Sequence, residues 1–394
     1  MAMKRASNNS GAVLSTSATP DVATIPLLSF FTGAGLLDLG FLQAGFNNIV
    51  WRNEYEPNFV RGFEFATHAH LGKEHKVTNT GSIHDATPRK IKKEAFNNTG
   101  TPELFGIVGG TPCPDFAFGG NNKGEHGEHG KLSQVYVDRI IALQPTFFLL
   151  ENVAGLSRTG KHQRFLKRLK AQLQEDYSIS LRVLNALDFG APQFRERVFI
   201  AGFSKRWLRR QFGFRFPQGY EDWFPWPKAK YPNAKGSYKW PGPSRFGGMP
   251  VKPKGIPDEL MVGNYICDIE ETSRLPNGMD GFRPKSKKFK TIREGDSSGK
   301  SFKRLHRWRY SPAAAYGNNE VHLHPVEPRR LTLREVLRIQ TVPDTYVLPH
   351  DLTLTHKYKM VGNGVPVVLA SAVASSFIKV LQGTFGVPSC PPPI

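Results

Sequence analysis

Residues 109–116 read Gly-Gly-Thr-Pro-Cys-Pro-Asp-Phe and directly follow a short apolar run at 103–108. The run predicts a short buried strand, and a residue at the carboxyl end of such a strand faces the ligand crevice of an open α/β sheet. Pro112 fixes the backbone just before Cys113, and the glycines before it leave room for a ligand to approach. We therefore predict that Cys113 is a nucleophile. The alternative, from the residue type alone, is a half-buried structural cysteine.

The chain around this stretch alternates strand-like and helix-like segments between residues 25 and 202, which is typical of a parallel α/β sheet. The strand-like segments are 26–31, 48–53, 104–108, 146–151, 181–185 and 197–203, and helical patterns are clearest at 132–143 and 161–174. After residue 205 the periodicity is lost and Pro, Gly, Lys and aromatic residues dominate, which predicts a loop-rich region. Regular structure returns with a helix capped by Thr332 and Glu335 and a last helix at 365–381.

The formal net charge of +20 is concentrated in one region. Residues 204–330 contain 26 Lys and Arg against 12 Asp and Glu, together with five of the six tryptophans. Basic residues interleaved with aromatic ones suit a nucleic-acid surface, because phosphates dominate the affinity and exposed bases stack on rings. A solvated basic face is the alternative interpretation.

Composition also limits the compartment and the kinds of site. The three cysteines, Cys113, Cys267 and Cys390, are too few and too far apart for a disulfide framework or a zinc cluster, so we expect no metal. No apolar run reaches membrane-spanning length, and residues 1–24 lack the apolar stretch of a signal peptide. We therefore expect an intracellular protein without a membrane segment.

Residues 30–36, Phe-Phe-Thr-Gly-Ala-Gly-Leu, connect the first predicted strand to a helix. Glycines at such a turn let the backbone approach a nucleotide-like ligand beside the helix N-terminus. Glu54, about twenty residues further at the end of the second strand, can accept hydrogen bonds from both ribose hydroxyls, and Tyr55 can stack on an adenine. Because the third glycine of the dinucleotide fingerprint is missing, S-adenosylmethionine fits better than NAD.

Six ordered blocks make the chain resemble the DNA (cytosine-5) methyltransferases of the bacterial restriction-modification type. They are 31–35 (Phe-Thr-Gly-Ala-Gly), 110–113 (Gly-Thr-Pro-Cys), 151–153 (Glu-Asn-Val), 193–197 (Gln-Phe-Arg-Glu-Arg), 330–340 (Arg-Leu-Thr through Gln) and 361–366 (Val-Gly-Asn-Gly-Val-Pro). Each block alone is common, but six in order with a basic insertion between the fourth and fifth are very specific. The resemblance implies an α/β, Rossmann-like S-adenosylmethionine-dependent catalytic domain with an inserted, loop-rich target-recognition domain.

The same resemblance implies methyl transfer from S-adenosylmethionine to C5 of a cytosine flipped out of a specific duplex DNA sequence, with S-adenosylhomocysteine as product. Cys113 would add to C6 of the base. Glu151 would protonate N3, which requires a pKa raised by a dry pocket. Asn152 would hold the loop around Glu151, Arg197 would grip the base O2, and Arg195 would position Glu151 and a nearby phosphate.

By the same resemblance, ten residues would line the cofactor pocket: Phe31, Gly33, Gly35, Glu54, Tyr55, Ile83, Pro112, Leu132, Asn363 and Val365. The family usually has Gly-Asp-Ile where this chain has Gly81-Ser82-Ile83, so the carboxylate that reads the adenine is missing there. Asp85 is the candidate to replace it. The glycine-rich segment 116–130 would be the loop that closes over a flipped base.

The family order divides the chain into five parts. These are a disordered extension at 1–24, the catalytic and cofactor-binding domain at 25–203, the target-recognition domain at 204–328, a return to the catalytic domain at 329–385 and a flexible tail at 386–394. The implied partners are double-stranded DNA and, for a restriction-modification pair, a separately encoded restriction endonuclease. We expect a monomer in the cytoplasm, associated with the nucleoid.

Three alternatives stay open. A tRNA cytosine-5 methyltransferase shares the catalytic blocks, but its Cys-Phe-Thr signature is absent here, since Cys267 is followed by Asp268. A catalytically silent nucleic-acid-binding module on the same scaffold is disfavoured by the intact catalytic blocks. A nicotinamide-dependent dehydrogenase is disfavoured by the missing third glycine and by the basic insertion.

Overall fold

The structure, a computed structural model, describes most of the chain. The described residues are 19–72, 74–97, 100–112, 128–158, 160–213, 216, 220–283, 286–299, 301–313, 316 and 321–385, with the backbone alone at 128, 129 and 161. The predicted nucleophile Cys113, residues 116–127 of the predicted closing loop, residues 1–18 of the predicted N-terminal extension and the predicted tail lie outside the described residues.

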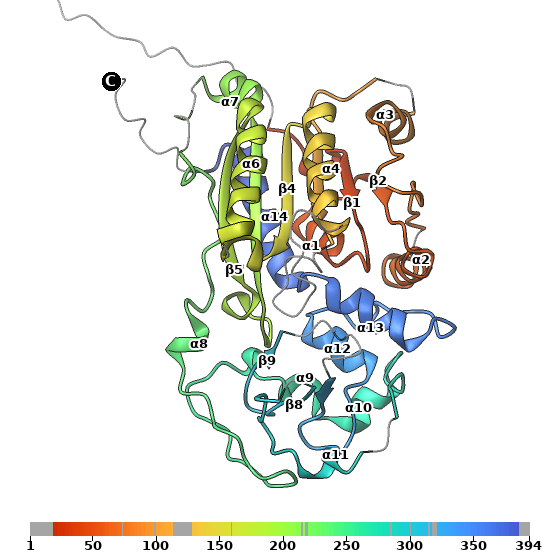
Figure 1. The fold of residues 1–394 in the computed structure, drawn as a ribbon, viewed down its shortest axis with the longest axis vertical. Helices are drawn as coiled ribbons and strands as arrows, with labels where there is room; N and C mark the ends of the chain where they lie inside the picture. The colour runs from red at the N-terminus through yellow and green to blue at the C-terminus, as the bar shows by residue number, and fades with distance from the viewer. Residues whose placement is uncertain are drawn as a thin grey trace, which may run out of the picture.

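A six-stranded sheet in the order β2-β1-β3-β4-β7-β5 forms the centre of the catalytic half (Figure 1). Its strands are β1 (Leu27–Phe30), β2 (Ile49–Asn53), β3 (Gly106–Gly110), β4 (Phe147–Val153), β5 (Tyr177–Asn185) and β7 (Glu196–Ser204). Strands β1 to β4 run parallel, which confirms the α/β prediction, whereas β7 is antiparallel to β4 and β5.

The interpretation as a parallel sheet is therefore wrong for β7, and the reason is the short connection before it. Only η3 (Ala186–Phe189) and the two-residue strand β6 (Gln193–Phe194) lie between β5 and β7. Neighbouring parallel strands need a crossover of a dozen or more residues, whereas a short return leaves the next strand antiparallel. Because β7 runs in the opposite direction, its first residues, rather than its last, lie at the edge of the sheet where β4 ends.

Helices cover both faces of the sheet (Figure 1). On one face, α1 (Leu36–Ala44) and α14 (Val367–Leu381) pack on Leu27, Phe147 and the other strand side chains that point to that face. On the other face, α3 (Pro88–Phe96), α4 (Glu128–Leu143) and α6 (Gly160–Asp176) pack on Leu28, Phe148 and the other strand side chains that point to that face. Successive strand residues alternate between the two clusters because side chains of a strand point to opposite faces. Burial on both faces explains the nearly continuous apolar strands.

The segment after β7 packs on the same core. α7 (Lys205–Phe212) begins there, and Trp207, Trp223 and Trp226 are 7%, 2% and 7% exposed within the cluster beneath the sheet. Trp223 Nε1 donates to the carbonyl oxygen of Ile179, and Trp226 Nε1 donates to Ser180 Oγ, so the segment covers the edge strand β5. The interpretation of these three tryptophans as part of a nucleic-acid surface is wrong, because their rings complete the apolar core.

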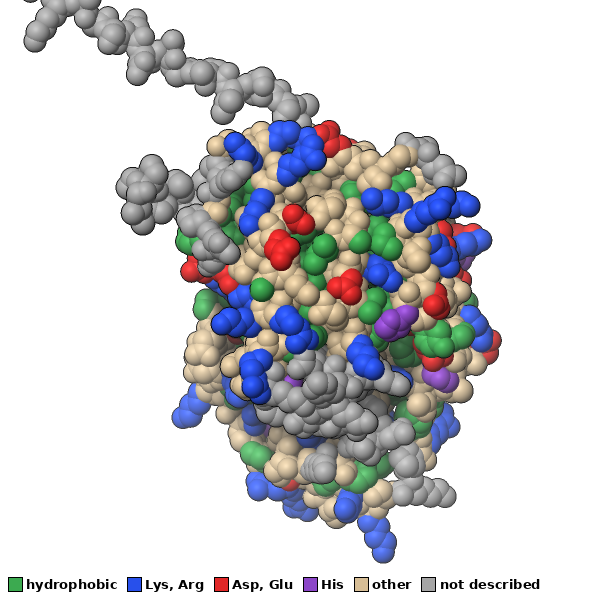
Figure 2. All heavy atoms as spheres, turned by 45° about the horizontal axis from the view of Figure 1, so that its top comes forward, with side chains coloured by type: hydrophobic (Ala, Val, Ile, Leu, Met, Phe, Trp, Pro, Cys, Tyr) green, Lys and Arg blue, Asp and Glu red, His purple; other side chains and the backbone are tan. Residues whose placement is uncertain are grey.

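The rest of the predicted recognition region is a loop-rich unit below the sheet in Figure 1. Its elements are α8 (Ala234–Ser237), η4 (Asp258–Leu260), α9 (Gly263–Ile266), α10 (Ile269–Arg274), α11 (Lys288–Thr291), β8 (Phe302–Arg304), β9 (Ser311–Pro312) and β10 (Val321–Leu323). β8 pairs with β10, and β9 pairs with β6, which joins the unit to the chain entering β7. In Figure 2, Lys and Arg side chains are spread over the face in view and continue onto the lower part of the molecule.

The remaining helices are η1 (Val22–Thr24), α2 (Pro57–Leu71), α5 (Gly155–Arg158), α12 (Leu333–Ile339) and α13 (Leu354–Asn363). The capping box predicted at the start of α12 is confirmed, since Thr332 and Glu335 each accept from the other's backbone N–H. One described segment, Leu354–Leu381, is long and apolar enough to cross a membrane by length and composition. It consists of α13 and α14, and 61% of its most apolar stretch is buried inside the fold.

Candidate active site

Glu151 lies near the carboxyl end of β4, where its side chain is buried against Arg197 from the start of β7. The antiparallel register brings the two together, because Val153 of β4 lies opposite Arg197. Arg197 Nε is 2.9 Å from Glu151 Oε1, and the two side chains are 11% and 8% exposed. The structure therefore places two of the five predicted catalytic residues in direct contact.

Burial raises the pKa of Glu151 above its ordinary value, and the positive charges of Arg197 and Arg195 act against that rise. Removing a carboxylate from water disfavours its charged form, whereas a neighbouring cation favours it. A carboxyl group with a raised pKa holds its proton to higher pH than an exposed glutamate does. Glu151 is thus suited to donate a proton to a proton-accepting group of a ligand bound beside it.

Gly110 provides the space for this carboxylate. It lies opposite Glu151 on the neighbouring strand β3, and a Cβ at position 110 would be 2.4 Å from Glu151 Oε2. Any other residue would force the carboxyl group to move. Position 110 therefore has to be glycine because the Glu151 carboxyl group occupies the space that a side chain there would need.

Asn152 is fully buried and belongs to a hydrogen-bond network of its own. Its Nδ2 donates to Thr111 Oγ1 over 2.8 Å, and Thr111 Oγ1 is 3.0 Å from Ser133 Oγ of α4. The network joins β4 and α4 to the segment that leads into Cys113. Sequence reasoning identified Asn152 but missed Thr111 and Ser133, because a hydroxyl group in a glycine-rich turn carries no signal of its partner.

Arg195 is buried between β6 and the C-terminal return. Its guanidinium donates to the carbonyl oxygen of Gly362 over 2.6 Å, and its backbone N–H donates to Asn185 Oδ1. Only 2% of the residue is exposed. The contact ties the predicted catalytic arginine to the block 361–366, and its charge reaches Glu151. Its predicted contact with a phosphate stays a prediction.

The loop after β1 has the backbone expected of a ligand-binding turn. Phe31, Gly33 and Gly35 have φ angles of 56°, 56° and 66°, a region that glycine adopts readily and phenylalanine rarely does. Gly33 N–H donates to Glu54 Oε2 over 2.7 Å, and Glu56 N–H donates to Glu54 Oε1. Burial raises the pKa of Glu54, and these backbone hydrogen bonds oppose the rise.

The other predicted cofactor residues surround this loop to different degrees. Ile83 is buried, and the half-buried Phe31 and Leu132 pack against the same apolar cluster. Val365 is buried in the other cluster, beneath the block 361–366. Tyr55 is 69% exposed, so its ring is open to a ligand. The positions that complete the predicted set are Pro112, half-buried after β3, and Asn363, exposed at the end of α13.

The chain segment 361–366 is held close to α1. A Cβ at Gly364 would lie 2.6 Å from Leu36 Cδ1, the first residue of that helix. The two segments are more than 320 residues apart in the sequence, and here the Leu36 side chain packs directly on the backbone of Gly364. The fold thus brings the first and last blocks of the sequence pattern to one place.

The turn that replaces Gly-Asp-Ile is held by a residue that the sequence did not single out. Arg139 of α4 donates to the carbonyl oxygens of Ala86 and Ile83 over 2.7 and 3.2 Å. Asp85 is exposed, and its backbone N–H donates to the carbonyl oxygen of Ser82. Whether Asp85 replaces the missing carboxylate stays a prediction.

A second buried network lies under the glycine loop. Arg52 Nε of β2 is 3.1 Å from Asp38 Oδ2 of α1, and Ser29 Oγ of β1 donates to Asp38 Oδ1 over 2.6 Å. Thr32, within the loop, has its hydroxyl 3.3 Å from Ser29 Oγ. A buried ion pair of this kind fixes the positions of the elements that carry it, here β1, β2 and α1.

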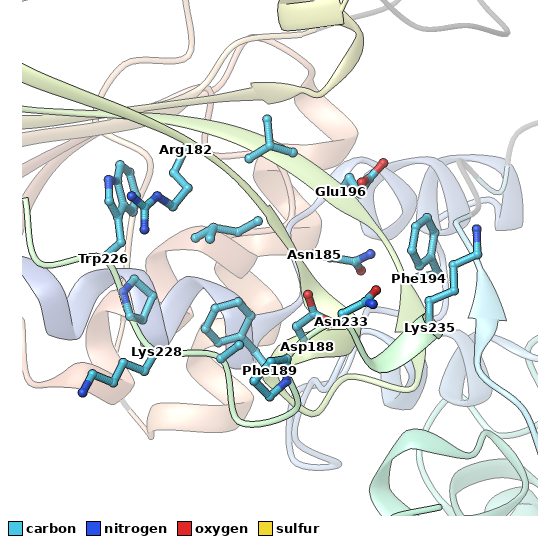
Figure 3. Close-up of a pocket in the computed structure, with 15 residues that line it drawn as sticks. Arg182, Asn185, Asp188, Phe189, Phe194, Glu196, Trp226, Lys228, Asn233 and Lys235 are labelled. Atoms are coloured by element: carbon cyan, nitrogen blue, oxygen red, sulfur yellow. The ribbon is translucent and has the colours of Figure 1, made fainter. Parts of the chain in front are cut away.

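A cavity of about 800 Å³ lies elsewhere, beside the edge strand β5 (Figure 3). Arg182, Phe194, Glu196 and Lys235 are among its lining residues, and the Lys235 ammonium lies 4.5 Å from the centre of the Phe194 ring. Neither Glu151 nor Arg197 lines it, so we assign it no part in the reaction. Among the residues that the structure describes, no group of three or more His, Cys, Asp or Glu is placed to hold a metal ion.

Comparison of the sequence with known proteins identifies a family. The family model of the C-5 cytosine-specific DNA methylases matches residues 25–379. The type II methyltransferase M.NmeDI of Neisseria meningitidis serogroup C is 40% identical over 371 residues, covering 91% of this chain and 84% of that protein. M.MthTI of Methanothermobacter thermautotrophicus, also a type II methyltransferase, is 30% identical over 373 residues, and the match covers 98% of that protein.

Solved structures agree at the level of the fold. The S. pombe Dnmt2 methyltransferase superposes with a TM-score of 0.58 at 14% sequence identity, over 91% of this chain and 99% of that one. The Entamoeba histolytica methyltransferase EhMeth superposes with a TM-score of 0.56 at 15% identity, over 91% and 98%.

Proposed function

Because this chain belongs to the C-5 cytosine-specific DNA methylase family, we propose that Cys113 forms a covalent adduct with the target cytosine beside the Glu151–Arg197 pair. The family match leaves the dehydrogenase alternative without support. The observation that carries the proposal is the buried glutamate with a raised pKa, held by an arginine at the end of β4 and opposite Gly110, which is three residues before Cys113 in the sequence. This is the arrangement that acid-assisted addition to a base requires.

In the proposed reaction the Cys113 thiolate forms a bond to C6 of the cytosine, and Glu151 gives its proton to N3. The electron pair that leaves the ring double bond makes C5 nucleophilic. S-adenosylmethionine supplies the methyl group that C5 accepts. Loss of the C5 proton to a base then restores the C5–C6 double bond as the C6–sulfur bond breaks and releases Cys113 as a thiolate, and N3 returns its proton to Glu151. Arg197 would donate to the base O2, and Arg195 would hold Glu151 in position.

The residues around the glycine loop fit S-adenosylmethionine. The Glu54 carboxylate accepts from the backbone N–H groups of Gly33 and Glu56, and the backbone N–H of Tyr55 also stabilises it. An ionised carboxylate has about four lone-pair sites, so it can still accept from the ribose. Tyr55 is open to stack on the adenine. The rest of the pocket would be formed by the other predicted residues, which are Phe31, Gly33, Gly35, Ile83, Pro112, Leu132, Asn363 and Val365.

We further propose that the region 204–328 recognises the duplex, as its positive charge and its place between the fourth and fifth sequence blocks suggest. Within it, the unit from α8 to β10 is the part that would contact DNA, because the segment up to residue 229 packs on the catalytic core. A separately encoded restriction endonuclease, a monomeric state and a cytoplasmic, nucleoid-associated location complete the proposal, supported by the similarity to type II methyltransferases.

The covalent step is tested with Cys113→Ser and with duplex DNA that carries 5-fluorocytosine at the methylated site. The variant should lose methyl transfer while it still binds S-adenosylmethionine, because a hydroxyl is a far weaker nucleophile than a thiolate at neutral pH. The fluorinated DNA should trap the wild type in a denaturation-resistant complex, since fluorine cannot leave as a proton does. Substantial activity in the variant, or no trapped complex with active wild type, would contradict the mechanism.

A further inference from the structure

Two large apolar side chains of the loop-rich unit are almost completely exposed. Met249 is 91% exposed and Val251 is 87% exposed. They flank Pro250 in the segment 238–257, which contains no helix or strand between α8 and η4. An apolar side chain held in water is ordinary when it stands alone, but two neighbours on one loop mark a contact surface.

The backbone of this loop is held in place by two half-buried side chains of the same unit, Arg307 and Trp308. The carbonyl oxygen of Pro250 accepts from Trp308 Nε1 over 2.8 Å, and that of Gly248 accepts from the Arg307 guanidinium over 3.0 Å. Arg307 is itself paired over 2.8 Å with Glu294, which is fully buried. The loop therefore presents Met249 and Val251 on a fixed backbone, which lowers the entropy cost of docking them against a partner.

The charge around the two side chains indicates the partner. Residues 238–257 contain four Lys and Arg and no Asp or Glu, and Arg245 and Lys254 are exposed on either side of the apolar pair. Lys252, between them, is paired with Asp258 over 2.7 Å and lies over the Trp308 ring. Cations on both sides of an apolar centre match a duplex groove, where phosphates flank base edges that accept apolar contacts.

The loop is also close enough to the candidate active site to share one duplex with it. Trp308 is three residues from Ser311 of β9, which pairs with Gln193 of β6, and Arg197 is four residues beyond Gln193. At about 3.6 Å per residue and about 5 Å between paired strands, this path is at most roughly 30 Å long. This path joins Trp308 to Arg197, and the hydrogen bond from Trp308 Nε1 to Pro250 joins Trp308 to the loop. The loop and Arg197 therefore lie apart by a distance on the order of one turn of B-DNA, about 34 Å, which a single bound duplex spans.

We propose that the loop 245–254 docks in a groove of the target duplex, with Met249 and Val251 against base edges and Arg245 and Lys254 against phosphates. The proposal rests on the proposed function, whose recognition region contains the loop. It assigns binding energy to apolar contacts in a region where charge alone would predict only phosphate contacts.

Three variants test the proposal: Met249→Ala/Val251→Ala, Arg245→Gln/Lys254→Gln and the control Met279→Ala, which truncates another methionine of the same region that is 63% exposed. The probe is a labelled 30-base-pair duplex that contains the sequence methylated by the wild type, mapped by bisulfite sequencing. The apolar double variant should bind it about tenfold more weakly with an unchanged salt slope. The charge variant should lower the slope by about 1.8, at about 0.9 per phosphate contact. Met279→Ala should stay within about twofold of wild type.

Binding of S-adenosylmethionine by each variant checks that the fold is intact. Wild-type affinity of the apolar double variant, or an equal loss in Met279→Ala, overturns the proposal. So does a result in which the double substitution changes only the self-association seen by size-exclusion chromatography, because a second copy of the chain would then cover the loop. Failure of the proposed function is distinguishable, since the wild type itself would then methylate no duplex.

Discussion

At the scale of single residues, Glu151 depends on neighbours that act in opposite directions. Its burial raises its pKa, and Arg197 and Arg195 oppose that rise. Gly110 allows the carboxyl group its position by having no side chain. The balance between burial and the arginine charges therefore sets the pH range over which the group can donate a proton.

Arg197→Met tests that balance. Without the guanidinium 2.9 Å away, the pKa of Glu151 should rise further, because the charge that favours the carboxylate is gone. A proton donor works below its pKa and is lost above it, so the alkaline limb of kcat against pH should move to higher pH. The value of kcat itself should fall about 10- to 100-fold with the loss of a charge-assisted hydrogen bond. An alkaline limb that stays in place would show that Glu151 is not the titrating acid.

Thr111→Val tests the network that leads into Cys113. Valine keeps the shape of threonine but leaves the buried Nδ2 of Asn152 without its acceptor, which costs about 1–3 kcal/mol. We expect kcat to fall about tenfold, with a smaller change in the KM for S-adenosylmethionine, since Thr111 is not itself among the predicted cofactor residues. Thr111→Ser keeps the hydroxyl and should restore most of the rate. Equal rates in the valine and serine variants would remove the hydrogen bond from the mechanism.

At the scale of elements, the site depends on how the helix pair α13–α14 meets α1. Arg195 donates to the carbonyl oxygen of Gly362, and Gly364 lies against Leu36 at the start of α1. These two contacts fix the turn between α13 and α14 beside Arg195, one of the predicted catalytic arginines, and beside the glycine loop. The position of the turn is therefore coupled to both halves of the site.

Gly364→Ala should disturb that coupling. The added Cβ would meet the Leu36 side chain at 2.6 Å, and such overpacking costs about 1–3 kcal/mol. We expect a lower melting temperature and a several-fold weaker affinity for S-adenosylmethionine by calorimetry, since Leu36 follows directly on the glycine loop. Gly160→Ala is the matched control, because a Cβ there meets nothing within 4 Å. Unchanged affinity in Gly364→Ala would separate the turn from the cofactor site.

At the scale of the whole molecule, the excess of positive charge should govern binding to DNA. Lys287, Lys288 and Lys290 are exposed around α11, which Phe289 anchors in a small apolar cluster. Replacing all three by Gln should flatten the log–log salt dependence of binding by up to about 2.7, at about 0.9 per phosphate contact. Cognate and non-cognate duplexes should weaken alike, and the methylated base should not change. Relaxed sequence choice with an unchanged slope would instead mean that the lysines read bases.

Local patterns in the sequence were sufficient for the strands, the main helices, the capped start of α12 and the family. These features depend on neighbours in the chain: alternation, helical spacing, turn residues and short blocks in order. Glu54 could be identified because it follows the second predicted strand, whereas Glu151 was identified through the resemblance to the family.

Only the tertiary structure decided which residues meet across that edge. The direction of β7 brings Arg197 to Glu151, Gly110 is needed because of a carboxylate 41 residues away, and Thr111 is bound to Asn152. Three of the five tryptophans that the sequence suggested for DNA instead fill the core, whereas Met249 and Val251, which no sequence pattern singled out, are exposed to solvent. The burial of a side chain and the choice of its partner depend on segments that are far apart in the sequence. A short stretch of sequence does not contain those segments, so it cannot predict either.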